Sequence, residues 1–241
     1  MKLKKVMALT MAGAMAATTL TACGSSSSTT ETTKAAETTA AAAADTTAAA
    51  AADNGSSDAE TVLQVAFENS ISEPVGQGWE KAQEIIKEKS GGKMAIEIYP
   101  DSQLGDKSSL IDSMLLGENV CTLADGAFYA DYGVPDFGIV FGPFLFDSWD
   151  QVWKLVDSDW YKEQCGKLEE KGLKIIASNW IYGERHTLTN VPVNTVDDLK
   201  GLKIRVPSNE IQSKGFDVLG ATSTGMALGD VYQALQTKTI D

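Results

Sequence analysis

From residue 61 onward, runs of β-branched and apolar residues alternate with segments whose apolar residues recur at helical spacing. The first run, residues 61–67 (TVLQVAF), predicts a strand. A helix should follow and end at Ser90-Gly91-Gly92, because apolar residues recur there at intervals of three or four: Val75, Trp79, Ala82, Ile85 and Ile86. Strands that alternate with helices are typical of α/β proteins with a mainly parallel sheet, so the sequence predicts that fold class.

The same alternation continues along the rest of the chain. It predicts strands at residues 93–99, 120–124 and 173–180, and helices at about residues 107–116 and 152–172, the second as one long helix. Residues 128–146, rich in aromatic residues, Gly and Pro, predict an irregular connection. Parallel sheets bind ligands beyond the carboxyl ends of their strands. This rule selects the segments after three strands as candidate binding loops: residues 68–70, Asp125 and residues 180–185.

The first residues set the expected location. Residues 1–22 are typical of a secretory signal, because Lys2, Lys4 and Lys5 precede an apolar stretch that is shorter than the about 20 residues of a membrane-spanning helix. The signal ends in LTACG, which resembles a bacterial lipoprotein cleavage box. That resemblance implies cleavage before Cys23 and its acylation, which would anchor the protein to the membrane surface. An ordinary signal with a chance Cys23 is the alternative.

Residues 23–60 contain Ser, Thr, Ala and acidic residues but almost no large apolar side chain. Such a segment cannot bury a core, so it predicts a disordered tether behind the lipidated Cys23. The remaining residues, 61–241, are numerous enough to bury one. We therefore expect a globular part held close to the membrane, which the protein contacts through its lipid anchor only.

The net charge narrows the choice of partners. The chain has 20 basic and 33 acidic residues, a formal charge of −13, and loss of the three lysines of the signal leaves 17 against 33, or −16. An acidic surface disfavours nucleic acid and anionic lipid headgroups. It does not exclude a small anionic ligand, because a nearby Arg outweighs distant charges beyond the Debye length of about 8–10 Å.

Cysteine and histidine usage predicts no cofactor and no metal. Cys121 and Cys165 favour two buried free thiols, although a disulfide between them stays open. His186 is the single histidine, and no Cys or His lies near it at zinc-ligand spacing. The sequence has neither a Gly-rich phosphate loop nor a nucleophile elbow. We therefore expect a protein that is not an enzyme.

Several motifs in a fixed order resemble one family. They are YPDSQLG at residues 99–105, FGPFLF at 141–146, DLKGLKIRVP at 198–207, GATSTGM at 220–226 and YQALQT at 232–237. In this order they resemble the extracytoplasmic solute receptors of tripartite ATP-independent periplasmic (TRAP) transporters, the DctP-like family. The resemblance covers residues 62–241.

The resemblance implies an α/β fold of two lobes that close on a ligand in the cleft between them, here residues 61–182 and a partial lobe at 183–241. The ligands of the family are small carboxylates: dicarboxylates, hydroxy and oxo acids, and sugar acids. The receptor acts as a monomer outside the cytoplasm and delivers its ligand to the two permease subunits of a secondary transporter. It performs no chemistry.

The resemblance also assigns the binding residues. Arg205, in the KIRVP segment, matches the family's chief carboxylate anchor, and its planar fork fits a carboxylate with two parallel hydrogen bonds. A structural ion pair is the alternative for Arg205, which lies in an apolar strand where a charge needs a partner. Arg185 matches a second position that holds the substrate, with a solvated loop Arg as the alternative.

The remaining expected binding residues are polar or apolar supports of the cleft. Asp125 is expected to accept a hydroxyl of the ligand or to pair with one of the arginines. Glu68 and Asn69, after the first strand, are expected to act in the same way. Met226 matches an apolar wall of the cleft, with core packing as an equal alternative.

Family members run on for roughly half again the globular length of this chain, so we expect the second lobe to be incomplete, ligand binding by the chain as written to be weak or absent, and its stability to be marginal. Two other functions stay open. One is a ligand-binding module that feeds a membrane sensor. The other is a secreted lipoprotein hydrolase, for which His186 is the only imidazole base. A structural lipoprotein is disfavoured by an Arg-bearing cleft.

Overall fold

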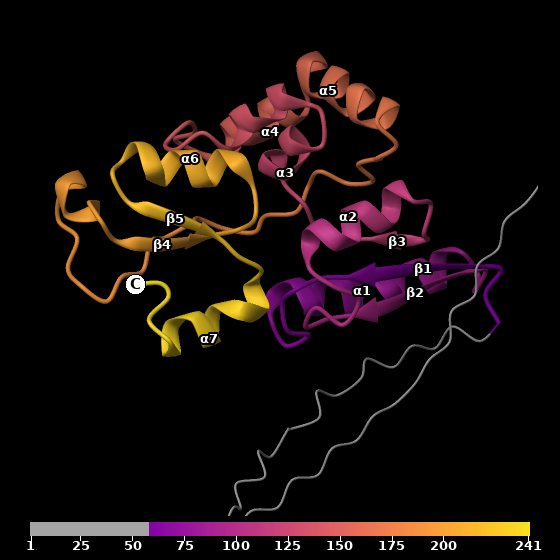
Figure 1. The fold of residues 1–241 in the computed structure, drawn as a ribbon. Helices are drawn as coiled ribbons and strands as arrows, with labels where there is room; N and C mark the ends of the chain where they lie inside the picture. The colour runs from indigo at the N-terminus through magenta and orange to yellow at the C-terminus, as the bar shows by residue number, and fades with distance from the viewer. Residues whose placement is uncertain (1–57) are drawn as a thin grey trace, which may run out of the picture. The chain divides into compact units, whose positions relative to one another are not determined.

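The computed structural model describes residues 58–241. The expected signal peptide, the lipidation site at Cys23 and most of the tether lie outside the described residues. The described part combines helices with two parallel sheets (Figure 1). The predicted α/β fold class is confirmed.

The first sheet has the strand order β2-β1-β3, and both of its pairings are parallel. Its strands are β1 (Thr61–Ala66), β2 (Met94–Tyr99) and β3 (Val120–Cys121). Helix α1 (Pro74–Lys89) connects β1 to β2. One face of the sheet and this helix share a core of buried residues: Val65, Phe67, Val75, Ile96 and Ile98.

The predicted C-terminal end of helix α1 is confirmed. Pro74 stands at its first position, where the fixed φ of proline suits a helix and the missing N–H has no partner to lose. Beyond Lys89 the chain turns through Gly91 and Gly92, whose φ values are +62° and +81°. Glycine adopts such angles without the steric strain of a Cβ, so the Gly pair ends the helix.

A turn after β2 places the next helix beside the end of β1. In the YPDSQLG motif, Asp101 and Ser102 have φ values of 54° and 58°. Their N–H groups donate to the carbonyl oxygens of Asn69 and Phe67, at 2.9 and 3.1 Å. Helix α2 (Lys107–Leu115) then begins, with the carboxylate of Asp106 accepting from the Ser109 N–H at 2.8 Å.

The expectation of an irregular connection at residues 128–146 is wrong. The structure has helix α3 (Gly126–Asp131) and a 3-10 helix, η1 (Pro135–Phe141). The two pack closely because position 126 is glycine: a Cβ there would lie 2.4 Å from the Phe137 carbonyl oxygen and 2.1 Å from a methyl of Val140. Phe128 and Phe137 are buried in a core shared with Ile111, Val134, Leu168 and Leu173.

The single long helix expected at residues 152–172 is two helices, α4 (Trp149–Val156) and α5 (Asp159–Glu170). The break has a local cause, since the Ser158 hydroxyl accepts from the Tyr161 N–H at 3.1 Å and so begins a new helix. The two helices are separated at Asp157 and Ser158. The apolar spacing continues across these two residues, so it does not indicate the break.

The predicted strand at residues 173–180 is also absent from the described part of the chain, and β3 is shorter than predicted. Side-chain exposure alternates only over residues 173–176, from Leu173 at 7% to Ile176 at 72%, and not beyond them. No described segment pairs with this stretch in a ladder. An alternating pattern defines a strand's two faces but not its hydrogen-bonding partner.

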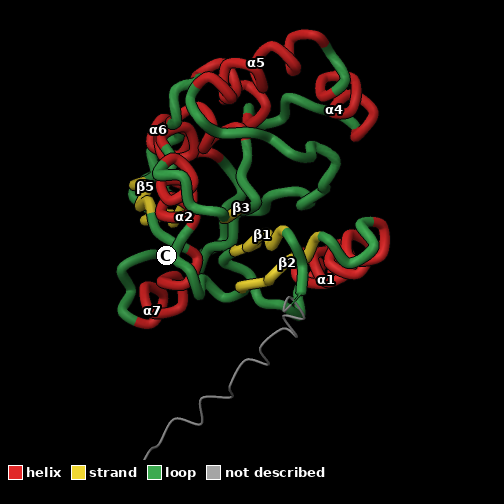
Figure 2. The backbone as a smooth tube through the Cα atoms, turned by 90° about the vertical axis from the view of Figure 1, so that its right-hand side faces the viewer, coloured by secondary structure: helices red, strands yellow, loops and turns green. Residues whose placement is uncertain are grey.

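The second sheet pairs β4 (Lys203–Val206) with β5 (Thr222–Gly225) in parallel. Helix α6 (Glu210–Val218) connects them, and η2 (Val196–Leu199) precedes β4. After β5 come η3 (Leu228–Asp230) and α7 (Val231–Gln236). This sheet has a core of its own, formed by Leu199, Ile204, Val206 and Ala221. Figure 2 shows the strands of the two sheets as two separate groups.

Two further expectations concern membranes and thiols. In residues 58–241, no helix has the length and apolar character that crossing a membrane requires. Cys121 and Cys165 are both free thiols, as the sequence favoured, but they are half-buried and not fully buried as expected. Burial raises the pKa of Cys121 to about 11, so this thiol is protonated and unreactive at neutral pH.

Candidate functional site

A small cavity lies beyond the carboxyl ends of β1, β4 and β5. Its walls come from both sheets and from helices α2 and α3: Glu68, Asp106, Lys107, Ser108, Phe128, Arg205, Pro207, Ser208, Met226 and Ala227. Its volume is about 10 Å³, space for roughly one water molecule. The cavity is where the strand-end rule places a ligand, and it collects three of the predicted binding residues, Glu68, Arg205 and Met226.

Strand β4 directs Arg205 out of the core of the second sheet. Successive residues of a strand face opposite sides, so Ile204 and Val206 are buried while Arg205 is half-buried on the other face. The guanidinium is fixed by the main chain of the neighbouring strand's end. Its Nε and Nη2 donate to the Met226 carbonyl oxygen at 3.0 and 2.7 Å.

Arg205 has no carboxylate partner within the described residues. Its Nη1 group, two of the five N–H donors of a guanidinium, therefore has no protein acceptor in the described part of the chain. Burial lowers the pKa of Arg205, and the nearby Glu68 carboxylate acts in the opposite direction. The side chain remains a cation, because an Arg in a protein does not lose its proton.

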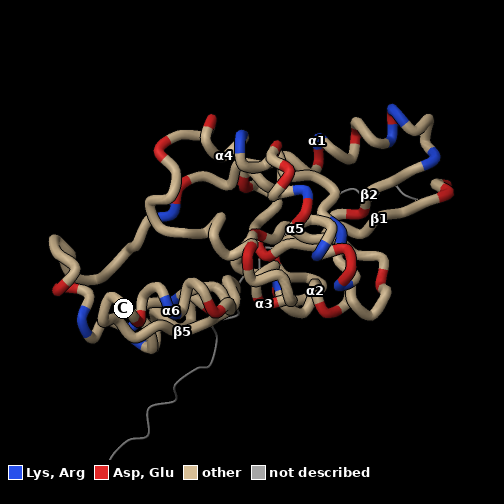
Figure 3. The backbone as a smooth tube through the Cα atoms, turned by 90° about the horizontal axis from the view of Figure 1, so that it is seen from above, with Lys and Arg blue, Asp and Glu red and all other residues tan. Residues whose placement is uncertain are grey.

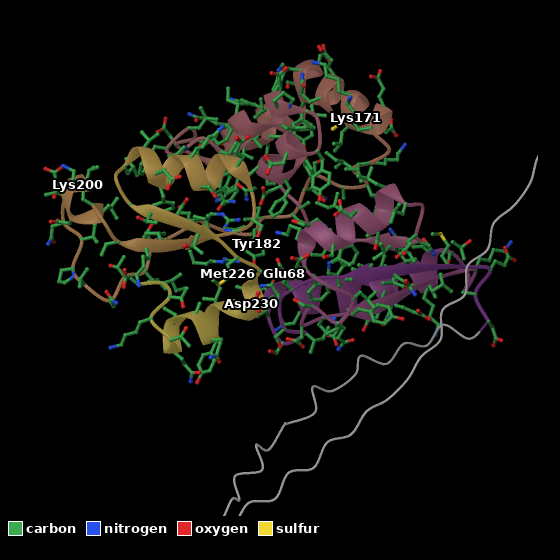
Figure 4. The ribbon with its side chains drawn as sticks, viewed as in Figure 1. Glu68, Lys171, Tyr182, Lys200, Met226 and Asp230 are labelled. Atoms are coloured by element: carbon green, nitrogen blue, oxygen red, sulfur yellow. The ribbon has the colours of Figure 1, made fainter. Side chains whose placement is uncertain are left out.

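The two sheets are joined across the cavity by Glu68. Its Oε1 accepts from the Leu228 N–H at 3.1 Å, which links the end of β1 to η3. Figure 4 shows Glu68 and Met226 next to each other, with Tyr182 close by. Asn69 is engaged elsewhere: its Nδ2 donates to Glu73 at 2.8 Å and to the Tyr182 hydroxyl at 2.9 Å. Asn69 does not line the cavity.

Arg185 and Asp125 form an ion pair outside the cavity lining, with 3.5 Å between Nη2 and Oδ2. The guanidinium of Arg185 lies 4.9 Å from the centre of the Phe141 ring. Asp125 also caps helix α3 by accepting from the Ala127 N–H at 3.0 Å. Of the two roles expected for Asp125, the structure shows the pairing with an arginine.

The sequence interpretation missed Lys107, a cavity-lining residue at the first position of α2. Its Nζ lies 4.8 Å from the centre of the Phe128 ring. Burial lowers the pKa of Lys107, while Asp125 and Glu68 act in the opposite direction. The available signal was its position directly after the YPDSQLG turn, since residues that begin a helix after a parallel strand face the ligand side of the sheet.

The described residues contain no group of three or more His, Cys, Asp or Glu side chains that could hold a metal ion. The charged groups around the cavity are instead two cations, Arg205 and Lys107, and two carboxylates, Glu68 and Asp106. Asp106 is occupied as the cap of α2. This set can bind an anionic oxygen group by charge-assisted hydrogen bonds.

Comparisons with known proteins identify the family of the chain. The family model described as bacterial extracellular solute-binding protein, family 7 (DctP) matches residues 65–241. A C4-dicarboxylate-binding periplasmic protein of Rhodobacter capsulatus is 32% identical over 168 residues, which are 70% of this chain and 50% of the relative. A sialic acid-binding periplasmic protein of Vibrio cholerae is 28% identical over 191 residues, 77% of this chain and 58% of the relative.

Among solved structures, a TRAP periplasmic solute-binding protein from Ochrobacterium anthropi with bound L-fuconate superposes with a TM-score of 0.72 at 40% identity. The match covers 75% of this chain and 60% of that one. The chain thus spans between half and about three fifths of the length of these relatives. These matches bear out the resemblance of its ordered motifs, and the chain belongs to the DctP family of bacterial extracellular solute-binding proteins.

Proposed function

We propose that the protein is an extracytoplasmic receptor that captures a small carboxylate and delivers it to a TRAP-type secondary transporter. The ligand class comprises dicarboxylates, hydroxy and oxo acids, and sugar acids. The observation that carries the proposal is the state of Arg205: its guanidinium is half-buried at a cavity, held by a main-chain carbonyl, and without a carboxylate partner in the described residues.

The physical argument concerns the missing partner. A charge that is withdrawn from water needs a compensating partner, and the Met226 carbonyl supplies only a partial negative charge. A carboxylate would supply the full charge and would match the free edge of the planar fork. A structural ion pair, the alternative for Arg205, would place a carboxylate of the protein there.

The relatives support the same ligand class. The L-fuconate complex from Ochrobacterium anthropi is joined by a protein of Actinobacillus succinogenes with bound L-galactonate, which is 34% identical with a TM-score of 0.72. The Rhodobacter capsulatus relative is named for C4-dicarboxylates. All of these ligands carry at least one carboxylate, the group that Arg205 is suited to hold.

Capture requires the cavity walls to separate. A volume of about 10 Å³ admits one water molecule, and no organic acid is that small. The hydrogen bond from Leu228 to Glu68 is one link between the opposing walls. Opening and closing of two lobes, here residues 61–182 and 183–241, is the usual way in which such a cleft admits a ligand.

Lipid anchoring at Cys23 and delivery to two permease subunits complete the proposal. A sensor module would use the same cavity, so gene neighbours distinguish it: genes for two multi-span membrane proteins favour transport, whereas a kinase gene favours sensing. A hydrolase is less well supported, because His186 is exposed and does not line the cavity.

The test is a thermal melt of the protein expressed from its full-length gene, with a panel of mono-, di-, hydroxy- and sugar acids, followed by titration calorimetry with each acid that shifts it. We expect at least one acid to raise the unfolding temperature, because a ligand that binds only the folded state stabilises it. A buffer with chloride in place of the acid, at equal ionic strength, is the control. A melt that no acid of the panel moves would contradict the proposed function.

A further inference from the structure

Figure 3 marks the positions of the Lys and Arg residues along the backbone. Most cationic side chains of the described residues are either paired or exposed. Several form ion pairs within one helix, such as Lys162 with Asp159 and Lys200 with Asp197. The Lys and Arg side chains without an ion pair in the described part fall into two groups. One group is exposed to solvent, where water satisfies the charge: Lys87, Lys89, Lys154, Lys171 and Lys238.

The second group consists of Arg205 and Lys107. Both are half-buried, neither forms an ion pair with a described residue, and both line the same small cavity. An unpaired cation is uncommon away from water because desolvation penalises its charge. Two of them at one cavity indicate two positions at which a negative partner is missing.

The surroundings of Lys107 disfavour the charged form of its ammonium group. Lys107 occupies the first position of α2, where the helix dipole places partial positive charge. Desolvation disfavours the ammonium most. Among the nearby charges, Asp125 and Glu68 attract it, and the guanidinium groups of Arg185 and Arg205 repel it. The Phe128 ring, 4.8 Å from Nζ, returns part of the lost stabilisation by a cation–π contact.

The carboxylates nearest to Lys107 have other partners. Asp125 pairs with Arg185 and caps α3. Glu68 accepts from the Leu228 N–H, and Asp106 accepts from the Ser109 N–H. Each therefore acts on Lys107 only as a neighbouring charge, and the three N–H donors of the ammonium have no acceptor among the described residues.

We infer that Lys107 is a second anion-binding residue, and that the ligand carries, besides the carboxylate held by Arg205, a second negatively charged group. That group is a carboxylate or a phosphate, since both offer an ammonium several anionic oxygens. The inference rests on the proposed function and narrows its ligand class to small dianions. Lys107 is then the residue that separates them from acids with one charged end.

The experiment is titration calorimetry on the full chain with matched pairs of ligands. Succinate is compared with butyrate, galactarate with galactonate, and 3-phosphoglycerate with glycerate. Each pair differs in one anionic group, and the last pair tells a phosphate from a carboxylate as the second group. We expect the dianion of at least one pair to bind at least about tenfold more tightly than its monoanionic partner.

Lys107→Met keeps the length of the side chain and removes its charge. We expect this variant to lose about 10- to 100-fold in affinity for the preferred dianion and to change by less than about threefold for the matched monoanion. Lys107→Arg should retain the preference for the dianion. Lys154→Met, which removes an exposed and unpaired cation of α4, is the charge-matched control and should bind like the unaltered protein.

A melt of the ligand-free variant distinguishes binding from a structural role. Removal of a desolvated cation from a helix N-terminus should leave the unfolding temperature of Lys107→Met unchanged or raise it by a few degrees, roughly 2–4 °C per kcal/mol. A lower unfolding temperature with equal losses for both members of a pair would assign Lys107 a structural role and overturn the inference.

Two other outcomes are informative. Binding of monoanions as tightly as dianions, unaffected by Lys107→Met, would overturn the inference and leave the receptor function standing. Failure of every acid to bind would overturn the proposed function, and the role of Lys107 with it.

Discussion

The two arginines assigned to ligand binding are in opposite electrostatic situations. Arg205 lies at the cavity with a carbonyl oxygen as its protein partner, whereas Arg185 lies in the segment after Trp180, paired with Asp125 and stacked on Phe141. Both residues are arginines, and the sequence places each of them in or just after a strand-like segment. The difference shows that the partner of a charge, more than the charge itself, decides whether it is available to a ligand.

The largest effect should follow from changes at Arg205. We expect Arg205→Ala to weaken binding of the preferred acid by about 2–3 kcal/mol, on the order of a hundredfold, because a charge-assisted pair is lost. Arg205→Lys should bind the acid almost as weakly as Arg205→Ala, since lysine keeps the charge but lacks the planar fork. Titration calorimetry measures both, and normal binding by Arg205→Lys would disprove two-point recognition of the carboxylate.

The fold around Arg185 should respond strongly to Gly126→Ala. A Cβ at position 126 would overlap the Phe137 carbonyl and the Val140 side chain, so α3 and η1 must separate. Overpacking of this kind costs about 1–3 kcal/mol of unfolding free energy. Urea unfolding measures the loss. Gly166→Ala, in an open position of helix α5, is the matched control and should be neutral or slightly stabilising. Equal stability of the two variants would contradict the close packing.

A smaller effect is expected at Arg185. Because Asp125 already balances its charge, Arg185→Ala should reduce the affinity for the acid by less than about tenfold. Asp125→Asn sharpens the comparison, since Asn still caps α3 but no longer competes for the guanidinium. We expect this variant to bind the acid at least as tightly as the unaltered protein. A large loss in calorimetry would instead make Asp125 a direct acceptor of a ligand hydroxyl.

The smallest effect is expected at Asp198, an exposed carboxylate whose partners are N–H groups and a hydroxyl instead of an arginine. Its oxygen Oδ2 accepts from the N–H groups of Asn194 and Thr195 at 2.9 and 2.8 Å, and these bonds lower the pKa of Asp198 below 3.8. The ionised form is favoured in the folded state, so its stabilisation is present above about pH 4 and is lost as the pH falls through the folded-state pKa.

Replacement of Asp198 by Asn should therefore lower the unfolding temperature slightly at pH 7, and the difference should shrink as the pH falls below about 4. Thermal melts across this range measure the change. A difference between Asp198→Asn and the unaltered protein that does not shrink with acid would show that the carboxylate does not stabilise the fold in its ionised form.

Sequence predicted the elements whose signals are local. The helix that follows β1 has both a regular apolar spacing and a glycine pair at its end, and α1 agrees with both. The stretch at residues 173–180 contains strand-forming residues such as Ile175 and Ile176 but has no strand to pair with in the described part. Pairing depends on segments far apart in the chain, which a local pattern does not contain.

The site shows the same limit. The position of Arg205 within a strand could be predicted, because its apolar neighbours and the motif agree there. The ion pair of Arg185 with Asp125 joins residues that are distant in sequence, so the sequence left several roles open for both. Lys107 was missed because its position beside the cavity is a property of the fold. In the sequence alone, a Lys at the start of a helix looks ordinary, and the absence of a partner for its charge is not visible.

Met226 acts on the cavity in two separate ways: its carbonyl oxygen holds the guanidinium of Arg205, and its side chain forms part of the wall. The anchor is fixed by an oxygen that every amino acid possesses, so substitutions at position 226 that keep the backbone in place leave it fixed. The side chain at the same position is free to change the shape of the cavity wall. The residue at position 226 can therefore be varied widely to change which acid fits the cavity, while Arg205 stays in place to bind the carboxylate.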